Sequence, residues 1–253
     1  MHLSVTVIAL NQEDHIGPCL ESVSFADEIV VVDTGSTDRT VELARAHTDR
    51  VVSAPWQGFG RTKNFALDQA RGEWVFSLDT DERVTPRLRE EILAVVRAGG
   101  PLPGYRVPRK NYVGSRWVRR LGWWPDYTLR LFRREQGRFL NREVHEEVEV
   151  AGPVGKLTAP LEHYSYRDLA EYAARQERYA RLAARELARQ GRRPLPGELL
   201  LRPLATFIKL YLLRGGFLEG ALGLGLALES SRYNFKKYFY LREMTRGVDL
   251  HAH

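Results

Sequence analysis

Two short apolar runs, each followed at once by acidic residues, constrain the fold of this chain most. Residues 29–32 precede Asp33, and residues 74–78 precede the acidic cluster 79–82. Runs of β-branched and aromatic residues of this length predict buried strands, such as those of parallel sheets covered on both faces. In an open α/β sheet, ligands bind beyond the carboxyl ends of the strands, so we expect both acidic clusters to border one crevice.

Carboxylates gathered in a crevice attract a cation. Asp79 and Asp81 are separated by one residue, and hard oxygen ligands in this arrangement suit Mg²⁺ or Mn²⁺. Such an ion can bridge the phosphates of a nucleoside diphosphate and take up charge on the leaving group. Taken alone, Asp33 also fits a helix cap, and the acidic cluster 79–82 also fits an acidic turn before a helix. The hypothesis of a sugar-nucleotide site therefore depends on the two motifs together.

The first hundred residues alternate between strand and helix patterns, which predicts βαβ units and a mostly parallel sheet. Ser36 or Thr37 is expected to cap the second helix, and Thr85 with Pro86 to open the fourth. The expected strands are 3–10, 29–33, 51–53 and 74–78, and the expected helices are 14–22, 37–46, 63–71 and 86–98.

From Gly104 onward the pattern changes to β-rich segments separated by turns, which predicts an antiparallel extension over 105–110, 127–133 and 144–150. We therefore predict an α/β catalytic domain over residues 1–165. Its donor-binding half is 1–100 and its acceptor half is 101–165. Residues 166–253 are expected to form a separate C-terminal helical region.

The C-terminal region is basic and amphipathic. Its apolar runs, 203–213 and 217–228, are shorter than the ~20 residues of a spanning helix. A basic amphipathic helix fits an anionic membrane surface. The pairs Glu171 with Arg175 and Glu177 with Arg181 also fit a solvated face, and the helix could equally pack on another helix or subunit. Membrane association and homo-oligomerisation both stay open. The arginines recur every three or four residues, at positions 175, 178, 181, 185, 189 and 192.

Charge and composition limit the partners. Thirty-eight Lys and Arg against 32 Asp and Glu give a net charge of +6, which favours an anionic partner. Nucleic acid is not expected, because the positive charge lies beside apolar segments and no reader module is recognisable. The first residues read as a strand and not as a signal peptide, so we expect the protein in the cytoplasm, at the inner face of the cytoplasmic membrane.

Four motifs, taken in order, are similar to those of the family 2 inverting glycosyltransferases, which have the GT-A fold. They are Ala-Leu-Asn-Gln-Glu at 9–13, Val-Val-Asp-Thr-Gly-Ser-Thr-Asp at 31–38, Lys-Asn-Phe-Ala at 63–66 and Leu-Asp-Thr-Asp at 78–81. The family usually has two adjacent acids after the second strand, whereas Thr34 follows Asp33 here.

Further motifs resemble a narrower group, the lipopolysaccharide inner-core β-1,4-glucosyltransferases, which shares this departure. They are Trp-Pro-Asp at 124–126, Leu-Arg-Leu-Phe-Arg at 129–133, Val-His-Glu at 144–146, His-Tyr-Ser at 163–165 and the segment 207–217.

The family resemblance implies a Rossmann-like donor domain and specific residue roles. Asp33 would hydrogen-bond the uracil, since a carboxylate can accept an imide N–H. Asp81 and Asp79, joined by His163, would hold Mn²⁺ or Mg²⁺. The residues implied in donor binding are Leu10, Asn11, Glu13, Asp33, Lys63, Asn64, Asp79 and Arg130.

Inverting transfer needs a base that removes the proton of the acceptor hydroxyl, and a carboxylate suits this role. Glu146 lies in the downstream acidic motif of the family and is the first candidate, with Asp126 as its rival and Glu147 as a third candidate. The resemblance implies a metal-dependent hexosyltransferase that moves glucose from UDP-glucose to a lipid-linked saccharide, such as the lipopolysaccharide inner-core heptose or another cell-surface glycan. A catalytically silent assembly subunit that only binds nucleotide sugar is the alternative.

Overall fold

The computed structural model describes residues 2–140, 147–195 and 197–246, and the chain divides into two compact units. One unit comprises residues 1–110 and 125–163, and the other comprises 111–124 and 164–253. Residues 111–124, which the sequence assigned to the acceptor half, belong to the second unit.

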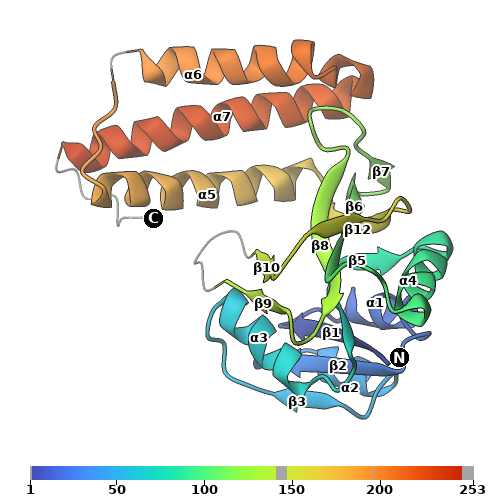
Figure 1. The fold of residues 1–253 in the computed structure, drawn as a ribbon. Coiled ribbons are helices and arrows are strands. Elements are labelled where there is room, and N and C mark those ends of the chain that lie inside the picture. Colours follow the sequence, from blue (N-terminus) through green and yellow to red (C-terminus); the bar gives the residue numbers. More distant parts are fainter. Residues whose placement is uncertain (1, 141–146, 196, 247–253) are drawn as a thin grey trace. The chain divides into compact units, whose positions relative to one another are not determined.

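The first unit is built on four parallel strands, in the order β3-β2-β1-β4 (Figure 1). Their bounds are β1 Leu3–Ala9, β2 Glu28–Asp33, β3 Val51–Ser53 and β4 Trp74–Asp79. The sheet continues through β8 (Asp126–Arg133), which is antiparallel to β4, and β6 (Gly104–Val113), which is antiparallel to β8. The predicted parallel sheet with an antiparallel extension is confirmed.

Several short strands complete the sheet and were not predicted. Beyond β6 lie β12 (Leu161–Tyr166) and β5 (Glu82–Val84), and two strands pair with β6, namely β7 (Arg116–Trp117) and β11 (Val154–Lys156). A separate two-stranded sheet joins β9 (Gly137–Phe139) to β10 (Val148–Val150). The strand expected over residues 144–150 is described only from Glu147 onward, where β10 forms its last part.

Alternate residues of the central strand β4 pack into two different hydrophobic cores, one on each face of the sheet. Trp74, Phe76 and Leu78 of β4 pack with apolar side chains of α1 (Ile16–Glu21), α2 (Thr40–Arg45) and α4 (Pro86–Ala98). Val75, between them, packs instead with Leu67 of α3 (Phe59–Gln69) and with side chains of β8 to β10. Helices therefore cover both faces of the sheet, as the long apolar runs predicted.

Helix ends follow local capping. The Thr85 side chain accepts the Leu88 N–H and Pro86 is the first residue of α4, as predicted. The prediction that Ser36 or Thr37 caps α2 was wrong, because Arg39 stands at that position and the Asp38 carboxylate accepts the Thr40 N–H at 3.0 Å. Asp38 also bonds the Thr40 hydroxyl, so this carboxylate fixes the start of the helix.

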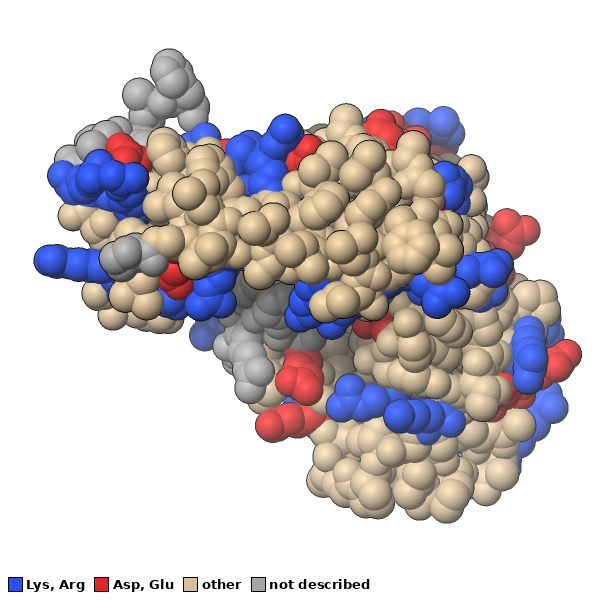
Figure 2. All heavy atoms as spheres, turned by 90° about the horizontal axis from the view of Figure 1, so that it is seen from above, with Lys and Arg blue, Asp and Glu red and all other residues tan. Residues whose placement is uncertain are grey.

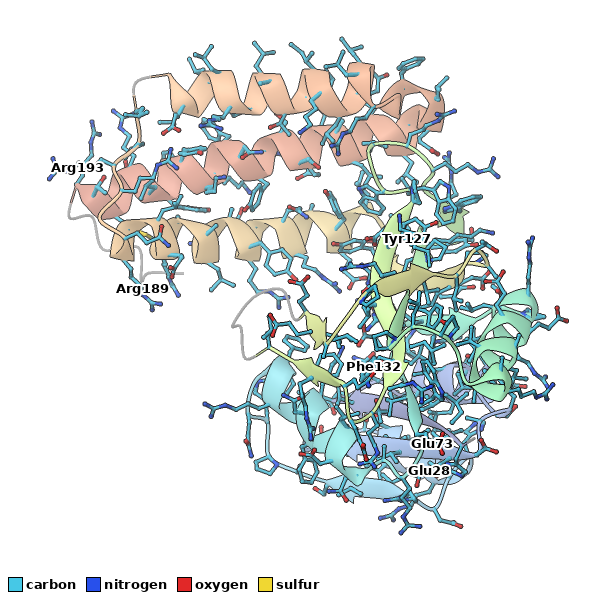
Figure 3. The ribbon with its side chains drawn as sticks, viewed as in Figure 1. Glu28, Glu73, Tyr127, Phe132, Arg189 and Arg193 are labelled. Carbon is cyan, nitrogen blue, oxygen red and sulfur yellow. The ribbon has the colours of Figure 1, made fainter. Side chains whose placement is uncertain are left out.

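Glu28, labelled in Figure 3 at the start of β2, joins three segments of the first unit. Its carboxylate accepts bonds from the Ser4 hydroxyl, the Arg71 N–H and the Arg50 guanidinium. Burial raises the pKa of this carboxyl, but the three donors outweigh burial, and the net pKa lies below the ordinary 4.5. The ionised form therefore stabilises the fold.

Glu28→Gln is expected to lower the free energy of unfolding by about 1–3 kcal/mol at neutral pH, because charged hydrogen bonds are lost. The contribution of a carboxyl with a lowered pKa is fully present above the unfolded value, 4.5, and is lost as the pH falls through the folded pKa. Urea unfolding should therefore show a smaller difference between variant and wild type below that pH. Exposed Glu73→Gln is the control and should change little.

The second unit is helical, as predicted for the C-terminal region. Helix α7 (Gly220–Thr245) packs against both α5 (Leu169–Arg189) and α6 (Glu198–Phe207). A π-helical turn (Ile208–Leu213) extends α6, and a 3₁₀ turn (Gly216–Glu219) leads into α7. The α5–α7 core contains Ala180 and Ala184 against Tyr238 and Leu241.

Part of the arginine stripe on α5 is occupied within the helical unit. Arg175 pairs with Glu171 at 3.1 Å, and Arg181 pairs with Glu177 at 3.1 Å, as the spacing predicted. The Arg181 guanidinium also lies over the Tyr240 ring of α7. Arg178, Arg185 and Arg189 are exposed. The stripe therefore contributes to helix packing as well as to surface charge.

Candidate active site

The loops after β1 and β2 are bonded to each other at the carboxyl ends of the strands. The Asn11 side-chain oxygen accepts the Thr37 N–H at 2.8 Å, and the Asn11 N–H donates to the Ser36 hydroxyl at 2.9 Å. Asn11 adopts a left-handed φ of 51°, which the side-chain bond helps to hold. Glu13 accepts the Arg39 N–H at 3.2 Å, and Leu10, just after β1, is 45% exposed. Three predicted donor residues thus lie on one bonded loop.

Asp33 is the last residue of β2 and is buried. Its carboxylate accepts the backbone N–H groups of Gly35, at 3.1 Å, and Ser36, at 3.2 Å. Gly35 has φ of 108°, a conformation that glycine adopts without strain. Asp33 therefore orders the turn after β2, and a carboxylate has further lone pairs with which to accept a ligand N–H.

Helix α3 brings Lys63 and Asn64 to this region with different partners. The Lys63 ammonium, almost fully buried, donates to Asp79 at 2.6 Å. The Asn64 amide makes two bonds with the backbone of Phe139, one to the carbonyl and one from the N–H, both at 2.9 Å. Asn64 thus ties α3 to β9, and its place beside the donor stays a prediction.

A buried chain of alternating charges runs across β4, β5, β8 and β6. Arg130 on β8 donates to Asp79 and, at 2.5 Å, to Glu82. Glu82 is completely buried, accepts the Asp79 N–H at 3.0 Å and lies 3.6 Å from Arg109. The chain continues from Arg109 on β6, whose two guanidinium nitrogens donate to Asp126 at 3.0 and 2.7 Å.

This chain sets the electrostatics of Asp79. Burial raises the pKa of Asp79, but the charges and hydrogen bonds of Arg130 and Lys63 outweigh it and lower the net pKa far below its ordinary value. Both carboxylate oxygens are bonded to cations, Oδ1 to Lys63 and Oδ2 to Arg130. Asp79 thus fixes these two cationic side chains at the carboxyl end of β4.

Asp81 lies beside His163, and both residues are predicted metal ligands. The Asp81 Oδ2 and His163 Nε2 atoms are 3.3 Å apart, on the segments that pair as β5 and β12. Burial raises the pKa of Asp81, whereas the His163 contact lowers it and prevails. Within the described part of the chain, no group of three or more His, Cys, Asp or Glu side chains is arranged to hold a metal ion.

The donor chemistry of this pair nevertheless fits a divalent ion. A carboxylate and an imidazole suit Mn²⁺, and donor phosphates and water can complete the coordination. Of the three predicted metal ligands, the structure therefore brings together Asp81 and His163, while Asp79 bonds Lys63 and Arg130. Of the candidate bases, Asp126 lies in the charge chain, and Glu146 lies outside the described residues.

Sequence reasoning missed two members of the charge chain. Glu82 was interpreted as part of an acidic turn, and Arg109 drew no attention because a single arginine in a β-rich segment carries no signal. No sequence signal marked Glu82, because the strand β5 that buries its side chain has only three residues. Charges buried this deeply are seldom found without partners.

Arg130→Met is expected to lower the free energy of unfolding by about 3 kcal/mol or more, because it leaves Glu82 buried without its closest cation. Arg138→Met is the matched control. Arg138 pairs with Asp68 on the surface, where both side chains are more than half exposed, so its loss should cost less than about 1 kcal/mol. Equal urea midpoints for the two variants would contradict this account of the chain.

The fold and the site define the class of this protein. A parallel sheet with acidic residues beyond the ends of β2 and β4, on either side of β1, is a Rossmann-like nucleotide-binding architecture. With its antiparallel extension it is the GT-A fold. Residues 4–151 match the family described as Glycosyl transferase family 2. The chain belongs to this family of glycosyltransferases.

Curated relatives match along almost the whole chain. The lipopolysaccharide core biosynthesis glycosyltransferase LpsC of Rhizobium meliloti (strain 1021) is 34% identical over 245 residues, which cover 92% of this chain and 89% of LpsC. An uncharacterized glycosyltransferase of Rickettsia bellii (strain RML369-C) is 26% identical over 98% of this chain and 91% of its own.

Solved structures also align with the chain. Residues 1–349 of S. aureus TarS align over 100% of this chain and 93% of that chain, with 16% identity and a TM-score of 0.48. A Mycobacterium tuberculosis glucosyl-3-phosphoglycerate synthase, solved with Mn²⁺, UDP and phosphoglyceric acid, aligns over 43% of each chain, with 28% identity and a TM-score of 0.38.

Proposed function

We propose that this glycosyltransferase is an inverting, metal-dependent enzyme that transfers glucose from UDP-glucose to a saccharide of the lipopolysaccharide core. The observation that carries the donor proposal is the placement of Asp33, Asp79 and Asp81 at the carboxyl ends of β2 and β4, the two strands that flank β1. Their carboxylates therefore border one end of the parallel sheet, where nucleotides bind in this architecture.

In the proposed complex, Asp33 accepts the uracil imide N–H, and Asn11 and Glu13 hold the loop beside it. Asp81 and His163 hold a divalent ion, which when bound offsets charge on the diphosphate. Asp79 keeps Lys63 and Arg130 in place near this end of the sheet. The two cations thereby add fixed positive charge beside the acidic residues.

Transfer then requires that one proton is removed from the acceptor, that one bond forms at the anomeric carbon and that one bond to this carbon breaks. A carboxylate base, Glu146 in the first instance, takes the proton of the acceptor hydroxyl. The hydroxyl oxygen forms a bond to the anomeric carbon on the face opposite the nucleotide, and the bond from that carbon to the diphosphate oxygen breaks. The electron pair leaves with UDP, and the configuration at the anomeric carbon inverts.

The acceptor proposal comes from the relative named for lipopolysaccharide core biosynthesis, whose similarity extends over 92% of this chain. An inner-core heptose, carried on lipid at the inner face of the cytoplasmic membrane, is the specific acceptor that we propose. Incubation with UDP-glucose and a core truncated at heptose should yield a product with one additional hexose by mass spectrometry. Donor hydrolysis without transfer would exclude this acceptor, and binding without either reaction would indicate an assembly subunit.

Thermal unfolding with UDP-, GDP- and dTDP-sugars in the presence of Mn²⁺ tests the donor. A ligand at about 100 times its dissociation constant stabilises the folded state by about 2.7 kcal/mol, so UDP-glucose should raise Tm by several degrees. Asp33→Ala should lose this shift. A larger shift with a GDP-sugar, or no shift with any of the donors, would contradict the proposal.

A further inference from the structure

Large apolar side chains are exposed along the turn from α6 into α7. Leu200 is 73% exposed, Leu213 79% and Leu218 60%. Figure 2 looks onto α6 and shows a broad tan area with blue and some red groups along its edges. We call this surface the leucine face. It comprises Leu200, Leu201, Leu204, Ile208, Leu212, Leu213, Phe217, Leu218, Leu224 and Leu228.

Part of the leucine face follows one side of α6 and of the turn after it. Residues 200, 204, 208 and 212 recur every four positions, so they share one side of α6 and of the π-helical turn. The other side of α6 packs on α7, where the Ser231 hydroxyl donates to the Pro203 carbonyl at 2.8 Å and the Asn234 amide donates to Thr206 at 3.0 Å. The exposed leucines are thus not needed for packing within the unit.

The exposed charge within residues 198–228 is entirely positive. The two acidic residues of this range, Glu198 and Glu219, are buried. Glu198 is bonded by Arg192 at 2.8 Å and by the Leu195 N–H at 2.9 Å, and Glu219 accepts two backbone N–H groups. Arg202, Lys209 and Arg214 are exposed in the same range. The apolar surface is therefore accompanied by cations, with no exposed carboxylate.

Among the described residues, no single helix combines the length and apolar composition of a span. The pair Glu198–Leu213 and Gly216–Thr245, which is bent by 68° at the break between its two parts, does so only when both parts are counted together. A side chain at Gly216 would come within 2.9 Å of the Leu210 carbonyl oxygen, so the backbone is tightly packed at this corner.

From these observations we infer that the leucine face is a docking surface for an anionic lipid bilayer, into which α6 and the following turn insert at the depth of the headgroups. An apolar face with adjacent lysine and arginine is what such an interface binds. Two copies pressed together through this face would bring like charges together, which disfavours a dimer. A docking surface of this kind would supply the membrane contact that the proposed lipid-borne acceptor requires. The observations for it come from the second, helical unit alone.

Vesicle flotation of the full-length protein tests the docking surface without donor or acceptor, so its outcome is separate from that of the transfer assay. The protein should float with vesicles that contain phosphatidylglycerol, and much less with pure phosphatidylcholine. Leu200→Ser combined with Leu213→Ser should reduce binding more than tenfold at low and at high salt. Arg202→Gln combined with Lys209→Gln should reduce it roughly fivefold per charge, at low salt only.

The matched control changes two exposed apolar residues outside the leucine face. Tyr179 and Leu182 on α5 are 41% and 47% exposed, and their replacement by serine should leave flotation nearly unchanged. Circular dichroism and Tm of the leucine and control variants should match the wild type, because none of these side chains is buried. Arg202 also pairs with buried Glu198 at 3.3 Å, but Arg192 keeps that carboxylate paired at 2.8 Å, so the charge variant should remain folded as well. Failure of the wild type to float, or an equal loss in the control, would overturn the inference. So would a leucine-dependent dimer that does not float.

Discussion

Replacing Glu146 by glutamine is expected to lower kcat by roughly 10²–10⁴-fold while donor affinity stays near the wild-type value. Glutamine keeps the shape of glutamate but cannot take the proton from the acceptor hydroxyl. Single-turnover transfer assays measure the chemical step, and calorimetry with UDP-glucose and Mn²⁺ measures donor binding. The prediction comes from the position of Glu146 in the motif Val-His-Glu at 144–146.

Two variants decide between the candidate bases. Asp126→Asn should reduce transfer much less than Glu146→Gln, because Asp126 Oδ2 accepts both Arg109 bonds and so has a structural role in the charge chain. Glu147→Gln tests the third candidate and removes a neighbouring carboxylate, so it should leave kcat near the wild-type value if Glu146 is the base. A loss of turnover confined to the Asp126 variant, with intact stability, would assign the base to Asp126 instead.

The strands of the donor half could be predicted because a short apolar run in the sequence is enough to indicate a buried strand at the same residues. Residues 29–32 are apolar, residues 74–78 are apolar apart from Ser77, and both stretches are buried in strands that run parallel to β1. Thr85 with Pro86 marked the start of α4 for the same reason, since the cap bond spans only three residues. Such patterns need no knowledge of distant parts of the chain.

The partners of the site residues could not be predicted, because they come from segments far apart in the sequence. Arg130 reaches Asp79 across 51 residues, and Asn64 reaches Phe139 across 75. The acidic motif at 79–82 indicated carboxylates at a strand end, but it gave no sign that buried cations neutralise two of them. Whether a carboxylate binds an ion or a guanidinium depends on strand order, and the order β4-β8-β6 is set by tertiary pairing.

In the C-terminal region, too, the sequence predicted the helices but not which of their side chains are exposed. The basic periodicity of α5 was visible in the sequence, and two of its predicted ion pairs are present. Which apolar residues face outward was not visible, because the runs 203–213 and 217–228 are apolar on several sides. The packing of α6 on α7 decides that Leu200, Leu204 and Leu212 are exposed.

Asp81→Ala is expected to lower kcat/KM on the order of 10³-fold and to abolish Mn²⁺-dependent binding of UDP-glucose, because the proposed ion loses its carboxylate. Asp81 is the acidic residue of the cluster that lies beside an imidazole, at 3.3 Å from His163, and its side chain is 28% exposed. Calorimetric titration of UDP-glucose with and without Mn²⁺ measures the expected loss directly.

Asp79→Ala separates the metal site from the charge chain. Because Asp79 is bonded to Lys63 and Arg130, its loss should leave two buried cations with less compensation and lower the free energy of unfolding by about 3 kcal/mol. Asp81→Ala should change stability less, because Asp81 is partly exposed and its contact is to a histidine. If the Asp81 variant bound UDP-glucose with unchanged Mn²⁺ dependence while the Asp79 variant lost it, the ion would belong to Asp79, and Lys63 and Arg130 would have to release that carboxylate when the donor binds.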